Sequence, residues 1–140
     1  MAAFNKFNAF VEAIAEKVHN LETDVLKVYL TNATAIATNS VKADIAEITA
    51  GNGYTAGGNT ATQTSSGQTS GTYKLVLADP ASWTATGGSI GPFRYAVLYN
   101  STTASGNLIG YWDYGSSITL GSGDTFTVDF DAATGVLTLA

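Results

Sequence analysis

The acidic side chains near the C-terminal end are the first candidates for chemistry. They are Asp113, Asp124, Asp129 and Asp131. Two facing carboxylates can hydrolyse a glycosidic bond, and Asp129 and Asp131 could share a calcium ion because they fall on the same side of a strand. The order Asp-x-Asp is nevertheless common at strand ends, and no ligand loop of Asp, Asn and Gly follows it. We interpret these residues as solvated carboxylates and expect neither a metal nor a cofactor.

The nucleophilic and phosphate-binding alternatives have equally little support. His19 is the only histidine and the chain has no cysteine, which excludes disulfides, thiolate metal sites and cysteine nucleophiles. No nucleophile and carboxylate are placed around His19 as a catalytic triad requires. The glycines at 51–58 lack the preceding strand, following helix and lysine of a phosphate loop. We therefore predict a non-enzymatic protein, in which His19 interacts with the C-terminal dipole of a helix.

Aromatic residues offer a different kind of site, a platform on which sugars stack. The candidates are spread over three predicted strands: Trp83, Tyr95, Tyr99, Tyr111, Trp112 and Tyr114. Alternation along 93–99 places Phe93, Tyr95, Val97 and Tyr99 on one face. In a small sandwich such a face is usually core, with hydroxyls reaching the rim. We favour core or subunit interface and keep ligand binding as the alternative.

Charge is sparse, which restricts the classes of partner. Only 12% of the 140 residues are charged, against about 25% in an ordinary soluble domain. A surface of Thr, Ser, Asn and Gly loses little on burial, and so suits a protein packed against copies of itself or a partner. The net charge is −5, and four of the six basic residues precede residue 43, so we expect no nucleic-acid partner. With no polybasic anchor, no apolar run of ~20 residues and no signal-like start, we also expect no membrane partner and synthesis in the cytoplasm.

Residues 3–20 have the spacing of an amphipathic helix. The apolar positions form one stripe: Phe4, Phe7, Val11, Ile14, Val18 and Leu21. Asn20 is a plausible C-terminal stop, and we assign 1–23 to an N-terminal amphipathic helix. A longer heptad helix through Val25 and Val28 remains open. We prefer a strand at 24–31, because that segment is rich in β-branched and aromatic residues.

Residues 24–72 are predicted to hold this strand and then an arm of small residues. Thr, Ala, Asn, Ser and Gly dominate 32–72, and 41–48 could be a short strand or a helical turn. Long structureless loops are uncommon inside compact domains. We therefore expect a flexible arm or an extended segment that lies along a neighbour.

Residues 73–140 alternate short strands with polar turns. We predict strands at 73–78, 82–85, 93–99, 108–114, 118–120, 125–130 and 136–139. Phe126, Val128 and Phe130 share one face of 125–130, which we pair with 136–139 as a hairpin. The predicted fold is mainly β, an antiparallel β-sandwich or jelly-roll-like domain with an N-terminal amphipathic helix. Residues 24–48 are expected to join 73–140 in one compact domain.

Four runs resemble small structural proteins of tailed bacteriophages. They are HNLETDVLKVYLTN at 19–32, AEITAGNGYTAGG at 46–58, GPFRYAVLYN at 91–100 and LIGYWDYGSSITLGSGDTFTVDF at 108–130. The resemblance is to proteins of the capsid decoration, or cement, type. It carries no catalytic residue.

This resemblance implies a virion protein that binds the outer surface of the capsid lattice as a homotrimer, after assembly in the host cytoplasm. Its partners would be the major capsid protein and copies of itself, bound with the avidity of several simultaneous contacts. We predict that apolar residues of the helix and arm make these contacts: Phe4, Phe7, Val11, Ile14, Val18 and Tyr54. The alternative is a tail or fibre component, including a receptor-binding or glycan-binding tip.

Overall fold

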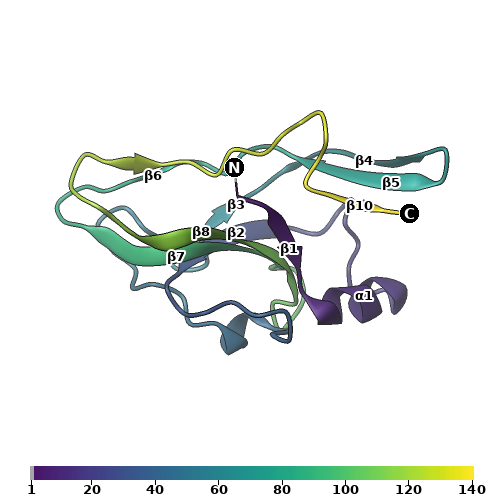
Figure 1. The fold of residues 1–140 in the computed structure, drawn as a ribbon, viewed down its shortest axis with the longest axis horizontal. Helices are drawn as coiled ribbons and strands as arrows, with labels where there is room; N and C mark the ends of the chain where they lie inside the picture. Colours follow the sequence, from purple (N-terminus) through teal and green to yellow (C-terminus); the bar gives the residue numbers. More distant parts are fainter. Residues whose placement is uncertain (1) are drawn as a thin grey trace.

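The computed structural model describes residues 2–140, which form mainly antiparallel β-structure with one short α-helix (Figure 1). The elements in chain order are β1 (Phe4–Lys6), α1 (Asn8–Ala15), β2 (Leu26–Thr31), the 3-10 turn η1 (Lys42–Asp44), β3 (Asn59–Thr60), β4 (Gln63–Thr69), β5 (Thr72–Leu77), β6 (Trp83–Thr84), β7 (Ile90–Asn100), β8 (Leu108–Leu120), β9 (Thr125–Phe126) and β10 (Leu137–Leu139). The mainly β, antiparallel class predicted from the sequence is confirmed.

A five-stranded sheet in the order β1-β8-β7-β2-β3 forms the middle of the molecule. A three-stranded sheet, β10-β5-β4, and the two-stranded ribbon β6-β9 form a second layer on one face of it (Figure 1). The segment of residues 33–45 lies on the opposite side of the middle sheet (Figure 1), where Ala35 and Ile45 pack against it. Helix α1 follows the edge strand β1 and contributes Phe10 to the core between the two β layers. Both faces of the middle sheet are therefore covered.

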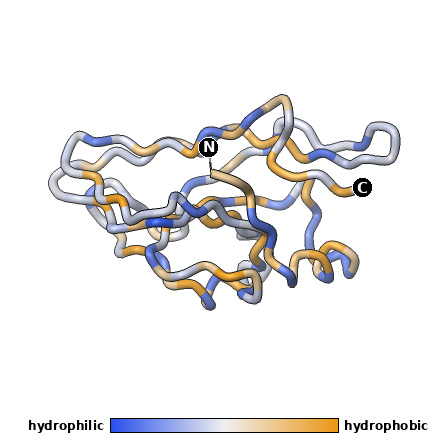
Figure 2. The backbone as a smooth tube through the Cα atoms, in the orientation of Figure 1, coloured by the Kyte–Doolittle hydropathy of each residue, from blue (hydrophilic) through white to orange (hydrophobic). Residues whose placement is uncertain are grey.

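Each covered face has its own apolar core. The larger core, between the two β layers, includes Val28, Leu98 and Trp112 from the middle sheet and Leu75 and Trp83 from the second layer. The smaller core, under the loops, is built from these residues: Phe7, Tyr29, Ala35, Ile45, Tyr95, Val97, Tyr99 and Leu108. Orange, hydrophobic stretches of the chain accordingly run through the middle strands (Figure 2).

The prediction that alternate side chains of 93–99 share one face is only partly right for strand β7. Tyr95, Val97 and Tyr99 lie together in the smaller core as predicted. Phe93 lies in the larger core, because the register with β8 shifts between Phe93 and Tyr95. An irregularity of this kind moves the following side chains to the other face.

The helix predicted for residues 3–20 and the assignment of 1–23 as helix are wrong in extent. Residues Phe4–Lys6 form strand β1, which pairs with Trp112–Gly110 of β8, and the helix covers only Asn8–Ala15. Lys17 has a φ of 63°, a left-handed conformation that no helix continues through. Formation of the β1–β8 ladder by Phe4–Lys6 is a tertiary interaction, which local periodicity does not reveal.

The predicted arm at 32–72 is also folded onto the chain itself. Ile45, Tyr54 and Ala61 are buried in the two cores, and β3 and β4 belong to the two sheets. The hairpin predicted between 125–130 and 136–139 is wrong, because β9 pairs with β6 and β10 pairs with β5. Val128 and Phe130 are nevertheless buried while Thr127 and Asp129 are exposed, as the alternation predicted.

Candidate binding surface

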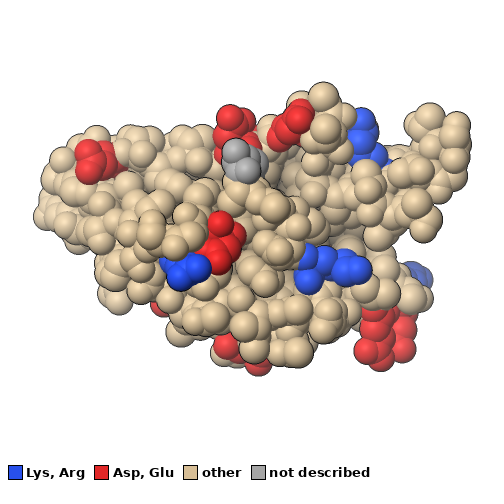
Figure 3. Space-filling view, viewed as in Figure 1, with Lys and Arg blue, Asp and Glu red and all other residues tan. Residues whose placement is uncertain are grey.

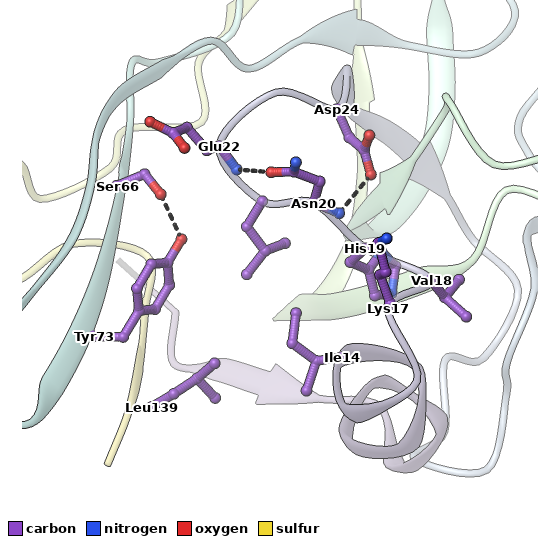
Figure 4. A pocket seen from close by; sticks show the side chains of 11 residues that line it. Ile14, Lys17, Val18, His19, Asn20, Glu22, Asp24, Ser66, Tyr73 and Leu139 are labelled. Carbon is purple, nitrogen blue, oxygen red and sulfur yellow. Dashed lines mark hydrogen bonds between the residues drawn. The ribbon is translucent and has the colours of Figure 1, made fainter.

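A groove of about 490 Å³ lies between the turn that follows α1 and the layer of β4, β5 and β10. Its lining mixes apolar and polar side chains: Ile14, Lys17, Val18, His19, Asn20, Leu21, Glu22, Asp24, Ser66, Tyr73 and Leu139. Ser66, Tyr73 and Leu139 form one wall, opposite Ile14 and Val18 (Figure 4). The hydroxyls of Ser66 and Tyr73 are hydrogen bonded at 2.9 Å.

The turn on the floor of this groove is held by a polar network. The Asp24 carboxylate accepts hydrogen bonds from the Asn20 backbone N–H at 2.8 Å and the Asn100 side-chain amide at 2.6 Å. The Gln63 amide donates to the carbonyls of Leu21 and Asp24 at 3.0 and 2.7 Å. Gln63 therefore ties the turn to the start of β4, and both sides of the groove are fixed relative to each other.

His19 is a buried member of this network, with 5% of its surface exposed. Its Nδ1 lies 3.0 Å from the Asn100 amide nitrogen, while the Asn100 amide oxygen accepts from the Thr102 N–H. Because the amide nitrogen can only donate, Nδ1 of His19 is the acceptor and Nε2 carries the hydrogen. That Nε2 is buried without a hydrogen-bond partner.

Burial lowers the pKa of His19 below its ordinary value of 6.5, and the nearby Asp24 charge opposes this only in part. The neutral imidazole fits the network, because a proton on Nδ1 would face the Asn100 N–H. The helix ends at Ala15, so the predicted interaction of His19 with a helix dipole is replaced by these contacts. His19 serves as a structural residue in this network.

Three of the predicted interface residues contact the chain's own interior. Phe7 is fully buried and Tyr54 is 3% exposed, so neither can contact a partner without unfolding. Phe4 is half-buried and packs on Trp112, with ring centroids 5.4 Å apart. The prediction that Phe7 and Tyr54 form an external interface is therefore wrong, since both are used to build the two cores.

The other three predicted interface residues are accessible. Val11 is 51% and Val18 is 36% exposed, while Ile14 is half-buried and lines the groove together with Val18. The structure therefore places Val11, Ile14 and Val18 at the surface of α1 and its turn. Their predicted contact with a partner stays a prediction.

Tyr54 takes part in a second polar cluster that fastens the 42–57 loop. Its hydroxyl donates to Glu47 at 2.6 Å and accepts from the Leu30 N–H at 3.1 Å. Glu47 also forms an ion pair with Lys42 at 2.7 Å, and Lys42 lies 4.8 Å from the ring centre of Tyr29. Burial, together with the hydrogen bond to Glu47, raises the pKa of Tyr54 far above its ordinary value. The cluster is a clamp between loop and sheet.

Three of the four acidic residues considered for catalysis make contacts in local structure, and the fourth, Asp129, is exposed. Asp113 forms an ion pair with Arg94 at 2.8 Å, Asp124 accepts from the Gly121 N–H and Asp131 accepts from the Ala133 N–H. Over residues 2–140, no group of three or more His, Asp or Glu side chains is arranged to hold a metal ion.

Few charges interrupt the visible surface, where most atoms belong to uncharged residues (Figure 3). Among residues 2–140, four large apolar side chains stay exposed: Val11, Val18, Val25 and Ile36. No helix within residues 2–140 has the length and apolar character needed to span a bilayer. Scans against protein-family models, curated proteins and solved structures gave no match to this chain.

Proposed function

We propose that this chain is a capsid decoration protein of a tailed bacteriophage, which binds the outer surface of the capsid lattice and stabilises it as a homotrimer. The resemblance of the runs at 19–32, 46–58, 91–100 and 108–130 suggests this class. The major capsid protein would be the partner and the virion the site of action. A decoration protein acts by binding, so the proposed function does not need a catalytic residue.

The observation that carries the proposal is the apolar surface of α1 and the turn after it. Val11, Val18 and Val25 are each at least 36% exposed and lie within residues 8–25, and Val18 lines the groove together with Ile14. Isolated exposed apolar residues are ordinary, but several along one short segment of a charge-poor chain favour a contact surface. Burying them against a lattice would expel water without desolvating many ions.

Particles of the encoding phage that lack this protein provide the test. Purified wild-type chain should bind them, whereas Val11→Asp should lower the affinity about tenfold or more, because a buried Val contributes about 1.5 kcal/mol or more. Occupancy is measured by quantitative gel analysis of sedimented particles. Ala132→Asp, which adds the same charge at an exposed position before β10, should bind like wild type.

Two results would count against the proposal. Failure of the wild-type chain to bind the particles would remove the decoration function. Equal occupancy for Val11→Asp and wild type would remove the role of the α1 surface. Deletion of residues 1–20 would not test this surface, because Phe7 and Phe10 belong to the cores and the fold would be lost with them.

A glycan-binding tail or fibre component has less support. The rings that could have formed a sugar platform are largely internal, since Trp83, Tyr95, Tyr99 and Trp112 are 1–6% exposed. Tyr73 is the aromatic residue that lines the groove. Binding of the isolated protein to a glycan array, together with no binding to particles, would favour this alternative over the capsid proposal.

A further inference from the structure

Strand β4 is an open sheet edge. It has seven residues, Gln63–Thr69, and lies at the end of the order β10-β5-β4 with β5 as its one neighbour. The β4–β5 hairpin extends away from the rest of the molecule (Figure 1). Five of its seven residues are exposed. The strand is therefore accessible from the side as well as from one face.

The hairpin register defines which backbone groups point outward. Ser70 and Gly71 form the two-residue turn, with φ values of 51° and 84°, so Thr69 and Thr72 are the closing pair. Gly67 is then the next β4 residue that exchanges hydrogen bonds with β5, opposite Lys74. Alternation leaves the N–H and C=O groups of Ser66 and Gln68 directed away from β5, toward the open edge.

This edge lacks the features that usually keep an exposed edge strand from pairing with another chain. Edge strands are commonly shortened, charged or interrupted by proline. The strands at the other sheet ends, β1, β3 and β10, have only two or three residues. Strand β4 is longer, contains no proline, and belongs to a stretch between Glu47 and Lys74 without a single charged residue. The bulge near Gln63 lies at its far end and leaves Ser65–Thr69 regular.

The open stretch of β8 provides an internal contrast. Beyond Trp112, β8 is not paired with β1, but Asp113 there forms its ion pair with Arg94 and Gly115 has a φ of 83°. A charge and a left-handed residue at an edge both discourage pairing with another strand. Among the strands described in residues 2–140, β4 is the long edge without such protection.

We propose that β4 pairs antiparallel with β4 of a second copy of this chain across a two-fold axis. Pairing centred on Gly67 would place Ser66 opposite Gln68 of the copy, which satisfies the outward backbone groups of both strands and joins two three-stranded sheets into one. The self-pairing is electrostatically permitted, because a two-fold axis brings identical residues together and β4 carries no charge that would be repelled by its copy. The contact is separate from the three-fold assembly proposed above, and it does not depend on capsid binding.

The mass of the full chain in solution tests this, measured by sedimentation velocity over a range of concentrations. Gln68→Pro removes one outward N–H and no backbone hydrogen bond between β4 and β5, at a position where edge strands tolerate proline. It also removes the side-chain acceptor of the Gly71 N–H in the turn, so the folding of the hairpin is checked directly. The wild-type assembly should have twice the mass of the Gln68→Pro assembly. Circular dichroism and a thermal melt establish that the variant is folded.

A second variant keeps the test independent of proline. Ser66→Lys places like charges diagonally across the two-fold axis on one face, so association should weaken at low salt and recover in part at high salt, where charges are screened. Thr72→Lys adds the same charge to the exposed start of β5 and should leave the mass unchanged. Amide hydrogen exchange at Ser66 and Gln68 should slow as the wild-type concentration rises.

The proposal is overturned if wild type and Gln68→Pro have the same mass at every concentration, or if the amides of Ser66 and Gln68 exchange at a rate independent of concentration. Equal weakening by Ser66→Lys and Thr72→Lys would also overturn it. These measurements contain no capsid, so their failure leaves the decoration proposal standing, and failure of capsid binding leaves the β4 contact standing.

Discussion

His19 illustrates how a single residue can be placed by contacts that its sequence neighbours do not reveal. It lies four residues beyond the helix end and contacts Asn100 from the end of β7. The sequence correctly favoured a structural role over a catalytic one, because no nucleophile and carboxylate surround it. The particular partners came from the tertiary fold.

The buried neutral state of His19 predicts a pH dependence of stability. Its folded pKa lies below the unfolded value of about 6.5, so the unfolded chain binds the proton first. The stabilisation is complete above pH 6.5 and is lost as the pH falls from there toward the folded pKa. Urea denaturation at pH 7.5 and 5.5 should show the free energy of unfolding falling, by at most about 1.4 kcal/mol per pH unit.

A His19→Gln variant is the control for this prediction, because its amide oxygen can still accept from Asn100 but does not titrate. Asp44, Asp113 and Asp131 have lowered pKa values, owing chiefly to hydrogen bonds from backbone N–H groups and from Arg94, so they stay ionised across this window. An equal loss of stability in wild type and His19→Gln would contradict the assignment to His19.

At the scale of elements, the 42–58 segment shows how a loop of small residues becomes part of the fold. Tyr54, Glu47 and Lys42 clamp it to the sheet, and the Tyr99 hydroxyl donates to the Gly57 carbonyl at 2.9 Å. The composition of this stretch predicted a loop correctly. Its attachment to the sheet was not predictable, because the contacts that reach the sheet join Tyr54 to Leu30 and Gly57 to Tyr99, which are distant in sequence.

Gly58 provides a test of that attachment. A Cβ there would collide with the backbone carbonyl of Val28 on β2, so Gly58→Ala should push β3 from β2. Gly87 is the matched control, with a φ of 73° against 72° for Gly58 and open space around its Cα. Both alanines cost about 1–2 kcal/mol for the left-handed backbone, but Gly58→Ala should cost about 1–3 kcal/mol more for the clash.

Urea denaturation measures both glycine variants, and hydrogen exchange of the Asn59 and Thr60 amides reports on β3. Equal destabilisation by the two substitutions would show that the close packing of the loop on β2 contributes nothing to stability.

At the scale of the whole molecule, two cores share one central sheet and the N-terminal segment reaches both of them. Phe7 packs in the smaller core and Phe10 in the larger, while β1 pairs with β8. The N-terminal segment is thus integral to the domain and cannot act as an appended helix. The division into a separate 1–23 helix and a later β domain does not describe this arrangement.

Removing residues 2–15 should therefore abolish cooperative folding. Truncating a buried Phe costs about 3–5 kcal/mol, and two such losses are comparable with the 5–15 kcal/mol stability of a typical domain. Thermal denaturation followed by circular dichroism should show no wild-type-like transition. Val11→Asp, at an exposed position of the same helix, should melt within a few degrees of wild type, and a truncated chain with an unchanged melt would contradict this account.

The sequence alone determined the class of the fold and the absence of a recognisable catalytic motif. Period-two alternation and turn residues are local signals, and they located β2, β5, β7 and β8 within a few residues, as well as the inward face of Val128 and Phe130. Spacing also found Val11 and Val18 as candidates for a partner surface, although for the wrong reason, since the true buried stripe of α1 runs through Phe10 and Ala13.

Only the tertiary structure decided which apolar residues are internal, which strands pair and where an edge stays open. Phe7 and Tyr54 became core residues, β10 paired with β5 instead of β9, and β4 was left with one neighbour. These outcomes depend on contacts between residues far apart in the chain, and their energies are absent from any local window. The groove beside α1 and the β4 edge are consequences of that long-range packing.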